Sequence, residues 1–385
     1  MRLLIAGGGT GGHIYPALAV ARSLHARPDA SDRLETSWVG GHRGLEETVV
    51  PRAGIPLRRL WLRSLRSAGR DIHLVLDPIR LGLSIPQALI LLVARRPAAI
   101  FTTGGYVAIP VLAAAALLRI PSLIWEGNRI PGRSVRLSGR MATLRTATFA
   151  AAALRLPSPT LVTGTPIRGL EGLARDEASR RLGLPADVPA MLVFGGSQEV
   201  RRFNAAVSEA ITELVERCAV IHITGAGGIE KAEADRARLP VERQHRYRPF
   251  SFLDEGMDAA LAAARVVVGR AGSSTLAECA AAGVPLVVVP YPHAAAHQQA
   301  NAAEMVDAGA AMLVNDEDFD GDTLREVCGM LHEPDRLADM SERARAMGRP
   351  WSAAASAELL LRLAARRPLP TQAEVDRLSG TGQAA

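Results

Sequence analysis

The chain has 385 residues, of which 48% are hydrophobic and 22% charged, and 45 lysines and arginines against 39 aspartates and glutamates leave a net charge of +6. This balance excludes a wholly disordered chain, and the length predicts two domains, because a single hydrophobic core rarely extends beyond about 250 to 300 residues. The three cysteines, Cys218, Cys279 and Cys328, form no Cys-x-x-Cys pair, so we expect no disulfide framework and no thiolate zinc site, as suits a reducing cytoplasm.

The chain opens with a short apolar run, residues 2–6, that leads into the sequence GGGTGGH. An apolar strand followed by glycines and then a helix is typical of a Rossmann-like domain, in which backbone amides approach a ligand closely. His13 follows this loop at the predicted helix start, where an imidazole, which titrates near neutral pH, suits a general base. The alternative is a histidine that only caps the helix or bonds a carbonyl group.

An apolar stretch at residues 81–94 is interrupted by polar residues and glycine and is too short to span a bilayer. Arginines flank it on both sides, at Arg58, Arg59, Arg63, Arg66, Arg70, Arg80, Arg95 and Arg96. Apolar side chains between arginines predict a segment that lies on an anionic membrane surface. A buried helix with solvated arginines at its ends is the alternative.

Short apolar runs alternate with longer Ala/Leu-rich segments, for example residues 191–194 before residues 203–215. This alternation predicts parallel sheets joined by crossover helices. The strand and glycines of the N-terminus recur in AMLVFGGSQ at residues 190–198, so we expect two Rossmann-like domains. The predicted domains span residues 1–162 and 163–350, followed by a C-terminal helix at 351–367 and a loose polar tail at 368–385.

The second half carries a dense polar cluster in VVVGRAGSSTLAECAAAGVPLVVVP, residues 266–290. Ser273, Ser274 and Thr275 offer hydroxyls and amides at a helix N-terminus, which favours an anion such as a diphosphate. Glu278, one turn further on, is placed to accept both hydroxyls of a ribose. The alternative is a helix-capping box formed by Thr275 and Glu278.

Two further loops of this half are rich in polar groups. Gly195, Gly196 and Ser197 precede a predicted helix and suit a phosphate oxygen. One short segment contains two histidines, His293 and His297, and three amide side chains, Gln298, Gln299 and Asn301. Amide side chains are suited to binding sugar hydroxyls. No carboxylate or third histidine accompanies that pair, so we expect no zinc there.

An acidic run, Asp316, Asp318, Asp320 and Gly321, resembles the start of a calcium loop, but Val327 stands where the bidentate glutamate belongs. The run also contains Asp-x-Asp triplets of the kind that hold a nucleotide-bound metal. We expect a solvated turn instead, with Asp322 capping the next helix.

Taken in order, these segments resemble the MurG family, the UDP-N-acetylglucosamine (UDP-GlcNAc) transferases that add the second sugar to the undecaprenyl-pyrophosphoryl-MurNAc-pentapeptide precursor of peptidoglycan. The match covers residues 1 to about 350. It is carried by GGGTGGHIYPALAVA, GLEETVVPRAGIPL, TTGGYVAIP, EGNRIPG, VTGTPIR, VFGGSQEVRRFN, ITGAGG, RAGSSTLAE and HAAAHQQAN. The resemblance implies an α/β GT-B glycosyltransferase fold, in which two Rossmann-like, doubly wound parallel-sheet domains face a cleft and the C-terminal one binds most of the nucleotide sugar.

The resemblance also implies roles for individual residues. The implied donor-binding residues are Thr10, Gly11, Gly12, Asn128, Arg168, Ser197, Phe252, Leu253, Ser273, Ser274, Thr275, Glu278, Gln298 and Gln299. Within this set, Phe252 would stack on the uracil, and Gln298 and Gln299 would contact the GlcNAc hydroxyls. The acceptor's pyrophosphate would meet a glycine loop and arginines, at Gly11, Gly12, Tyr106, Arg129 and Arg133.

His13 is the implied catalytic base. It would take the proton from the C4 hydroxyl of MurNAc as that oxygen attacks C1 of GlcNAc from the face opposite UDP, which inverts the anomeric centre. A helix N-terminus and Arg168 would stabilise the leaving diphosphate, so no metal or other cofactor is expected. The expected partners are UDP-GlcNAc, the lipid-linked acceptor and an anionic membrane, and the expected location is peripheral, on the cytoplasmic face of the cell membrane.

Four positions depart from the family's usual pattern: Trp125, Gly127, Arg265 and Ser274 replace histidine, glutamine, aspartate and leucine. The departures concern the acceptor side and the uridine rim, so one alternative is an inverting GT-B enzyme that glycosylates a different lipid or metabolite. Another is a UDP-sugar epimerase on the same scaffold, for which Glu46 and Glu126 are the candidate carboxylates. A nucleic-acid binder is not expected, because no Lys/Arg stripe with interleaved aromatic residues is present.

Overall fold

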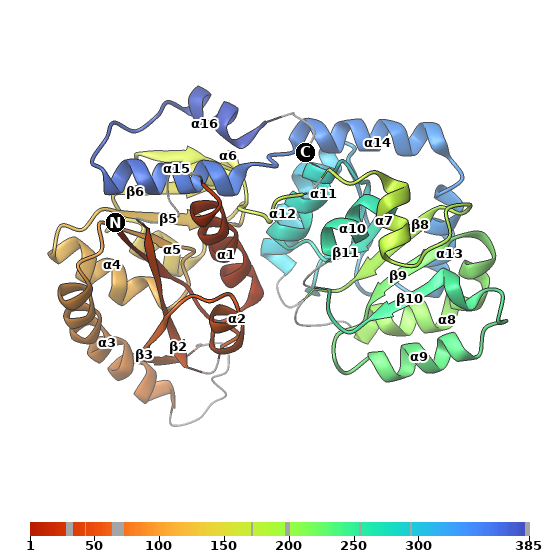
Figure 1. Cartoon of the computed structure of the whole chain (residues 1–385), viewed down its shortest axis with the longest axis horizontal. Helices are drawn as coiled ribbons and strands as arrows, with labels where there is room; N and C mark the ends of the chain where they lie inside the picture. Colours follow the sequence, from red (N-terminus) through yellow and green to blue (C-terminus); the bar gives the residue numbers. More distant parts are fainter. Residues whose placement is uncertain are drawn as a thin grey trace. The chain divides into compact units, whose positions relative to one another are not determined.

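The structure, a computed structural model, describes residues 1–27, 34–42, 44–63, 73–170, 172–196, 201–253, 256–292 and 295–381. The chain forms two compact units, each built on one parallel sheet (Figure 1). The first unit comprises Met1–Arg168 and Trp351–Ser379, and the second consists mainly of Gly169–Pro350.

The sheet of the first unit has seven strands in the order β3-β2-β1-β4-β5-β6-β7. Their bounds are β1 Arg2–Ala6, β2 Glu35–His42, β3 Leu57–Arg63, β4 Ala99–Thr102, β5 Ser122–Glu126, β6 Leu144–Ala147 and β7 Thr160–Val162. The chain leaves β1 toward one edge of the sheet and returns at β4 on its other side. In open parallel sheets, ligands bind beyond the carboxyl ends of the strands at such a switch point, which here lies between β1 and β4.

Helices cover both faces of this sheet (Figure 1). Because successive strand residues point to opposite faces, Leu3 and Ile5 of β1 pack with helices α1 (Gly11–His25) and α15 (Ser352–Ala364). Leu4 and Ala6 instead pack with helices α3 (His73–Arg95) and α4 (Ala108–Leu117). Burial on both faces explains why the strands read as continuous apolar runs.

The first unit continues to Arg168, past residue 162, where we placed the domain boundary. The segment after β7 belongs to this unit because it is tied to buried groups: the indole Nε1 of Trp125 donates to the carbonyl of Gly164 at 3.0 Å, and Thr163 and Thr165 are buried. Trp125, one of the departures from the family pattern, is itself fully buried in the core of the unit.

The C-terminal residues return to the first unit. Residues 372–379, which we expected to lie in a loose tail, form helix α16 (Gln372–Ser379) beside β7. The expectation was wrong because the side chain of Gln372 completes the edge of the sheet, donating to the Val162 carbonyl at 2.9 Å and accepting from its amide at 2.8 Å. Val375 is fully buried in the same core.

The sheet of the second unit has six strands in the order β10-β9-β8-β11-β12-β13, which repeats the topology of the first sheet. The bounds are β8 Ala190–Phe194, β9 Ala219–Ile223, β10 Tyr247–Phe250, β11 Ala264–Gly269, β12 Leu286–Val288 and β13 Ala311–Leu313. Met191 and Val193 of β8 pack with α8 (Arg201–Arg217) and α13 (Gly321–Met330). Helix α10 (Met257–Ala263) contacts β8 and β11, and the neighbouring α11 (Ser273–Ala282) packs against α14 (Pro334–Met347).

The remaining helices are short or peripheral: α2 Glu46–Arg52, α5 Arg133–Ser138, α6 Ala150–Ala153, α7 Arg175–Arg181, α9 Ile229–Ala237 and α12 Ala295–Asp307. In the part of the chain that the structure describes, no helix combines the length and apolar character that crossing a bilayer requires.

Candidate active site

The first glycine loop joins β1 to α1 and places His13 at the third residue of that helix, half-buried. Its ring Nδ1 lies 2.8 Å from the carbonyl oxygen of Thr103, at the end of β4, and the Thr103 hydroxyl donates back to the His13 carbonyl at 2.8 Å. A carbonyl oxygen only accepts, so Nδ1 carries the proton and the neutral ring has its lone pair at Nε2. This is the tautomer that a general base with a fixed ring orientation requires.

A buried carboxylate holds the glycine loop from the inside. Glu46, the first residue of α2, is fully buried and accepts the Gly9 amide at 2.8 Å and the Gly41 amide at 3.0 Å. A Cβ atom on Gly8 would come 2.4 Å from Glu46 Oε1, so only glycine allows this approach. The Tyr106 hydroxyl also donates to Glu46, at 3.3 Å. Glu46 therefore fixes the path of the backbone that leads into the first turn of α1.

Tyr106 was expected at the acceptor, and the structure places it beside that loop. Burial raises the pKa of its hydroxyl, and the Glu46 carboxylate raises it further, so Tyr106 stays a neutral donor to Glu46. Its direct contact with an acceptor stays a prediction.

The loop after β5 is organised in the same way by a second carboxylate. Glu126 is buried; its Oε1 accepts the Asn128 amide at 2.8 Å and the Asn128 side-chain Nδ2 at 3.1 Å, and its Oε2 accepts the Gly132 amide at 2.8 Å. Arg129 is half-buried in this loop, and Arg133 is exposed at the start of α5. Both carboxylates that an epimerase would require, Glu46 and Glu126, thus act as acceptors that shape loops.

Thr10, Gly11 and Gly12 form the start of α1 beside His13. Thr10 is the N-cap residue, and its carbonyl accepts the His13 amide at 3.0 Å. The amides of Gly11 and Gly12 belong to the first turn, where a helix leaves its N–H groups without intrahelical partners. These amides suit an anion, so the structure brings the predicted base and the predicted anion-binding amides into one turn of helix.

In the second unit, helix α11 begins at Ser273 at the carboxyl end of β11, with Gly272 as its N-cap residue. Ser273, Ser274 and Thr275 are therefore its first three residues, and Glu278 follows one turn later. The capping-box interpretation is wrong, because Thr275 lies inside the helix and cannot be its N-cap.

The other predicted donor residues lie in neighbouring loops of the same sheet edge. Phe252 follows β10 and is 63% exposed, with Leu253 next to it. Gln298 and Gln299 lie on α12, and the Gln298 side chain accepts the Tyr291 amide at 2.8 Å, which ties this helix to the loop after β12. Two residues fall elsewhere: Arg168 belongs to the first unit, whereas Ser197 lies outside the described residues, as does His293.

Arg265, which the resemblance associated with the uridine rim, is the second residue of β11. It lies at the amino end of this strand, at the opposite edge of the sheet from the loop that begins α11. The expectation was wrong because a strand separates the two positions.

Arg270, for which the sequence predicted no role, follows directly after β11. It is buried, and its guanidinium donates to the Val289 carbonyl at 3.2 Å and pairs with Asp316. It lies 5.3 Å from the ring centroid of Tyr291. Arg270 therefore holds the loop after β12 against the carboxyl end of β11. A charged residue directly after an apolar strand was the only signal in the sequence.

The acidic run is used structurally, as expected, but the capping residue was misassigned. Asp320 caps α13, since its side chain accepts the Thr323 amide at 3.0 Å in a capping box. Asp322 lies inside the first turn and pairs with Arg325 at 2.7 Å. The expected cap was wrong by two residues because the helix begins earlier, at Gly321.

A buried polar network supports the loops of the second unit. His222 on β9 accepts the Tyr247 hydroxyl at Nδ1 (2.8 Å) and donates from Nε2 to the Asn204 side-chain oxygen (3.0 Å). The Asn204 amide nitrogen donates to the Thr224 carbonyl at 3.0 Å. The network ties the first turn of α8, which follows the Gly195–Gly196 loop, to the end of β9.

This network predicts a loss of stability in acid. Burial lowers the pKa of His222 to about 3 from its ordinary 6.5. Below pH 6.5 the unfolded chain binds a proton that the folded chain rejects, so stability is complete above pH 6.5 and is lost as the pH falls toward 3. Between pH 7.5 and 5.0 we expect a loss of about 2 kcal/mol in the second unit.

The measurement is hydrogen-exchange protection of the β9 amides, because all four tryptophans, Trp38, Trp61, Trp125 and Trp351, lie in the first unit and fluorescence would not report on the second. His222→Gln should flatten this pH dependence, and His245→Gln, at an exposed position, should leave it unchanged. If stability fell equally with pH in wild type and in His222→Gln, His222 would not be the cause of the loss in acid.

Comparison with known proteins places these features in a class. The Glycosyltransferase family 28 N-terminal domain matches residues 3–145, and the Glycosyltransferase family 28 C-terminal domain matches residues 190–355. With its two parallel sheets, the chain is a glycosyltransferase of the two-domain GT-B fold.

A protein of Desulforudis audaxviator (strain MP104C), named UDP-N-acetylglucosamine--N-acetylmuramyl-(pentapeptide) pyrophosphoryl-undecaprenol N-acetylglucosamine transferase, is 35% identical over 95% of this chain and 99% of its own length. The crystal structure of Acinetobacter baumannii MurG is 27% identical, with a TM-score of 0.71 over 94% of this chain and 99% of that one. The chain belongs to the MurG family.

A putative UDP-N-acetylglucosamine 2-epimerase from Listeria monocytogenes also aligns, with a TM-score of 0.65 over 95% of this chain and 97% of that one. It is only 15% identical, so it shares the fold alone.

Proposed function

We propose that this enzyme transfers GlcNAc from UDP-GlcNAc, with inversion, to the C4 hydroxyl of MurNAc in undecaprenyl-pyrophosphoryl-MurNAc-pentapeptide. The observation that carries the proposal is the joint placement of His13 and the first-turn amides of α1, in a chain that is 35% identical to a transferase of this name over nearly its whole length. The alternative acceptor loses support, because the identity extends through the first unit.

On the acceptor side, the proposed base is His13. With Nδ1 hydrogen-bonded to the Thr103 carbonyl, Nε2 takes the proton of the attacking hydroxyl. The first-turn amides of Gly11 and Gly12 would bind the acceptor's pyrophosphate, with Arg129 and Arg133 in the loop after β5 as further cationic groups.

On the donor side, the start of α11 would hold the diphosphate of UDP. Ser273, Ser274 and Thr275 contribute amides and hydroxyls where the helix dipole favours an anion, and Glu278 would accept the ribose hydroxyls. Negative charge that develops on the leaving diphosphate would be stabilised at this helix start without a metal. Phe252, whose ring is exposed on a loop of the same sheet edge, would stack on the uracil.

The test is transfer from radiolabelled UDP-GlcNAc, with EDTA present, to a short-chain analogue of the undecaprenyl-pyrophosphoryl-MurNAc-pentapeptide acceptor. Product formed in the presence of EDTA would support the proposed donor, the proposed acceptor and a reaction that does not require a metal. Binding of UDP-GlcNAc without transfer would redirect the proposal to another acceptor. Activity that returns only with added Mg²⁺ would contradict the metal-free mechanism.

We also propose that the enzyme is located peripherally, on the cytoplasmic face of the membrane. Helix α3 supports the contact with a membrane surface. Its outer face exposes four aliphatic side chains that a helical repeat of about 100° per residue places on one side: Ile79, Leu83, Ile90 and Val93. The opposite face, with Ala88 and Leu92, packs in the core.

Basic and aromatic groups adjoin this stripe. Trp61 is exposed on β3, and the Arg80 guanidinium lies 5.7 Å from its ring centroid. Arg58, Arg59 and Arg96 are exposed in the same part of the first unit, whereas Arg66 and Arg70 lie outside the described residues. An apolar stripe bordered by arginines is typical of a surface that binds anionic lipid. The sequence left two alternatives for this segment, a buried helix and a helix lying on a membrane. Helix α3 has one face buried in the core, and we propose that its other face contacts the membrane.

We expect the double substitution Leu83→Gln and Ile90→Gln to weaken binding to phosphatidylglycerol vesicles at least about tenfold, because it removes apolar area from the stripe. Vesicle sedimentation measures this, and wild-type binding should weaken with salt. Transfer to a short-chain acceptor should stay within about twofold of wild type.

The matched control is Leu154→Gln, which changes a side chain that is 89% exposed on the same unit but outside the stripe. Equal vesicle binding by wild type and the double variant would show that the exposed face of α3 does not bind the membrane.

A further inference from the structure

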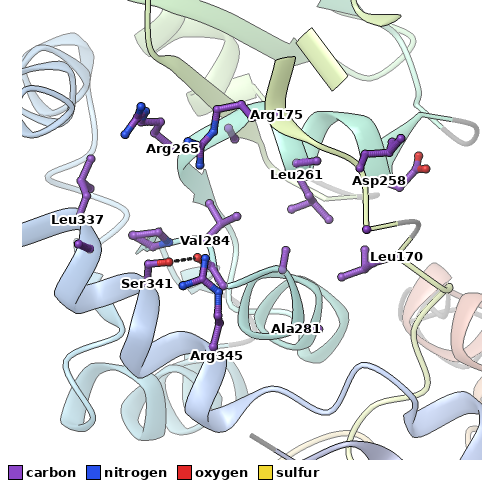
Figure 2. A pocket seen from close by; sticks show the side chains of 18 of the residues that line it. Leu170, Arg175, Asp258, Leu261, Arg265, Ala281, Val284, Leu337, Ser341 and Arg345 are labelled. Carbon is purple, nitrogen blue, oxygen red and sulfur yellow. Dashed lines mark hydrogen bonds between the residues drawn. The ribbon is translucent and has the colours of Figure 1, made fainter. Parts of the chain in front are cut away.

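The second unit contains a cavity of about 510 Å³ that the proposed reaction does not use. It is bordered by the segment before α7, by α10, by the amino end of β11, by the end of α11 and by α14 (Figure 2). Aliphatic side chains line much of it, among them Leu170, Leu261, Val284 and Leu337. Its volume falls within the range of about 300 to 1,000 Å³ that is typical of small-molecule sites.

Three arginines from three different elements border this cavity: Arg175 at the start of α7, Arg265 on β11 and Arg345 on α14. Figure 2 shows Arg175 and Arg265 on one side and Arg345 extending from α14 on the other. Among the lining residues that the structure describes, Asp258 is the only carboxylate. The lining therefore carries an excess of positive charge.

Within the described ranges, none of these three guanidinium groups makes an ion pair or hydrogen bond. Arg343, only two residues from Arg345 on the same helix, does pair with Asp339, at 2.9 Å. Burial lowers the pKa of Arg175, and the positive charges of Arg265 and Arg345 lower it further. The Asp176 carboxylate, next to Arg175 in the chain, raises this pKa, but it is the smallest of the effects. Like charges brought together raise the free energy of the empty site, and a bound anion would lower it.

The position of Arg345 is set by packing against the end of α11. Gly283 ends that helix in a left-handed conformation, with φ +64°, and a Cβ atom there would come 2.4 Å from Arg345 Nε. The Ser341 hydroxyl donates to the Gly283 carbonyl at 2.6 Å (Figure 2). Because two contacts hold α14 against this turn, the stem of Arg345 is directed along the cavity wall.

The cavity is separate from the donor loops. Helix α11 begins at the loop of Ser273 and ends at Gly283, so its ten residues span about 15 Å between the two places. Arg265 is likewise at the amino end of β11, whereas the donor loop follows its carboxyl end.

We propose that the cavity bordered by Arg175, Arg265 and Arg345 is a second ligand site, which binds a small molecule carrying a phosphate or diphosphate group. Guanidinium groups match phosphate oxygens with paired N–H donors, and three of them supply the charge that a diphosphate requires. The aliphatic lining suits the remainder of such a molecule. A cavity walled by five elements favours a small molecule over a flat lipid surface.

The experiment is isothermal titration of the full chain with inorganic pyrophosphate at low salt. We expect saturable binding that weakens about 10- to 100-fold in Arg265→Gln and in Arg345→Gln, since each removes charged hydrogen bonds. Arg343→Gln, on the same helix but outside the cavity, should bind as wild type does. Arg345→Lys keeps the charge and should retain part of the affinity.

Two further arms separate this site from the alternatives. UDP-GlcNAc affinity should be equal in wild type and in both glutamine variants, which shows that these variants fold and that the donor site is intact. Pyrophosphate binding that is absent, or unchanged in both glutamine variants, would overturn the proposal. So would binding of phosphatidylglycerol vesicles that depends on Arg265 and Arg345 without pyrophosphate binding, because the source would then be a lipid headgroup. These outcomes are independent of whether transfer to the lipid-linked acceptor is observed.

Discussion

Replacing His13 by alanine is expected to lower kcat about 10²- to 10⁴-fold, the range for loss of a positioned general base. The Kd for UDP-GlcNAc should stay within about twofold, because the predicted donor groups at the start of α11 belong to the second unit. The measurement combines initial rates of transfer with titration of the donor.

His25→Ala is the matched control, since His25 is exposed at the other end of α1 and should leave kcat unchanged. Glu278→Ala should show the converse pattern, a raised Kd for UDP-GlcNAc. A His13→Ala enzyme that retains most of its turnover would remove His13 as the base. Equal loss of donor affinity in His13→Ala and Glu278→Ala would contradict the division of roles between the units.

Glu46→Gln is expected to destabilise the first unit by about 2 to 3 kcal/mol and to lower kcat as well. Both oxygens of the buried carboxylate accept hydrogen bonds, one from the half-buried Gly9 amide and the other from the buried Gly41 amide and the Tyr106 hydroxyl. An amide NH2 in place of one oxygen would face a donor and leave it unsatisfied, which costs about 1 to 3 kcal/mol for each such group. Because the Gly9 backbone leads into α1, the position of His13 should become less defined.

Urea unfolding followed by tryptophan fluorescence measures the first effect, since all four tryptophans lie in the first unit. The matched control is Glu47→Gln, which removes a solvent-exposed ion pair with Arg59 at 3.3 Å and should cost less than about 1 kcal/mol. If Glu46→Gln were as stable and as active as Glu47→Gln, the carboxylate would have no part in holding the loop.

The predicted architecture is confirmed in its main features, because its signals are local. Apolar runs such as residues 191–194 become strands buried on both faces, and the repeated strand-glycine pattern marks β1 and β8, which occupy equivalent places in two sheets of the same topology. The C-terminal segment was less predictable. Residues 372–379 are polar in sequence, and their helix is stabilised by contacts with β7, which is more than 200 residues earlier in the chain.

Some residues of the candidate site were predictable from local sequence, and others were not. His13 and the serines of α11 follow glycines at predicted helix starts, a pattern visible in the sequence, and the structure places them there. Glu46 was named only as a carboxylate for a different reaction, because nothing near it in the chain shows that it accepts the Gly9 amide. Arg270 had no predicted role, since its partner Asp316 lies 46 residues away.

By itself, the sequence determined the fold class, the two-domain organisation and the helix starts that carry the predicted chemistry, since apolar period, glycine position and helix dipole act over a few residues. Only the tertiary structure decided the tautomer of His13, the burial of Glu46 and the meeting of Arg175, Arg265 and Arg345 at one cavity. Each of these depends on groups that are distant in the chain, and their separation after folding cannot be read from local pattern. Hydrogen bonding and charge act over a few ångströms, so the chemistry of such groups is set when the chain has packed.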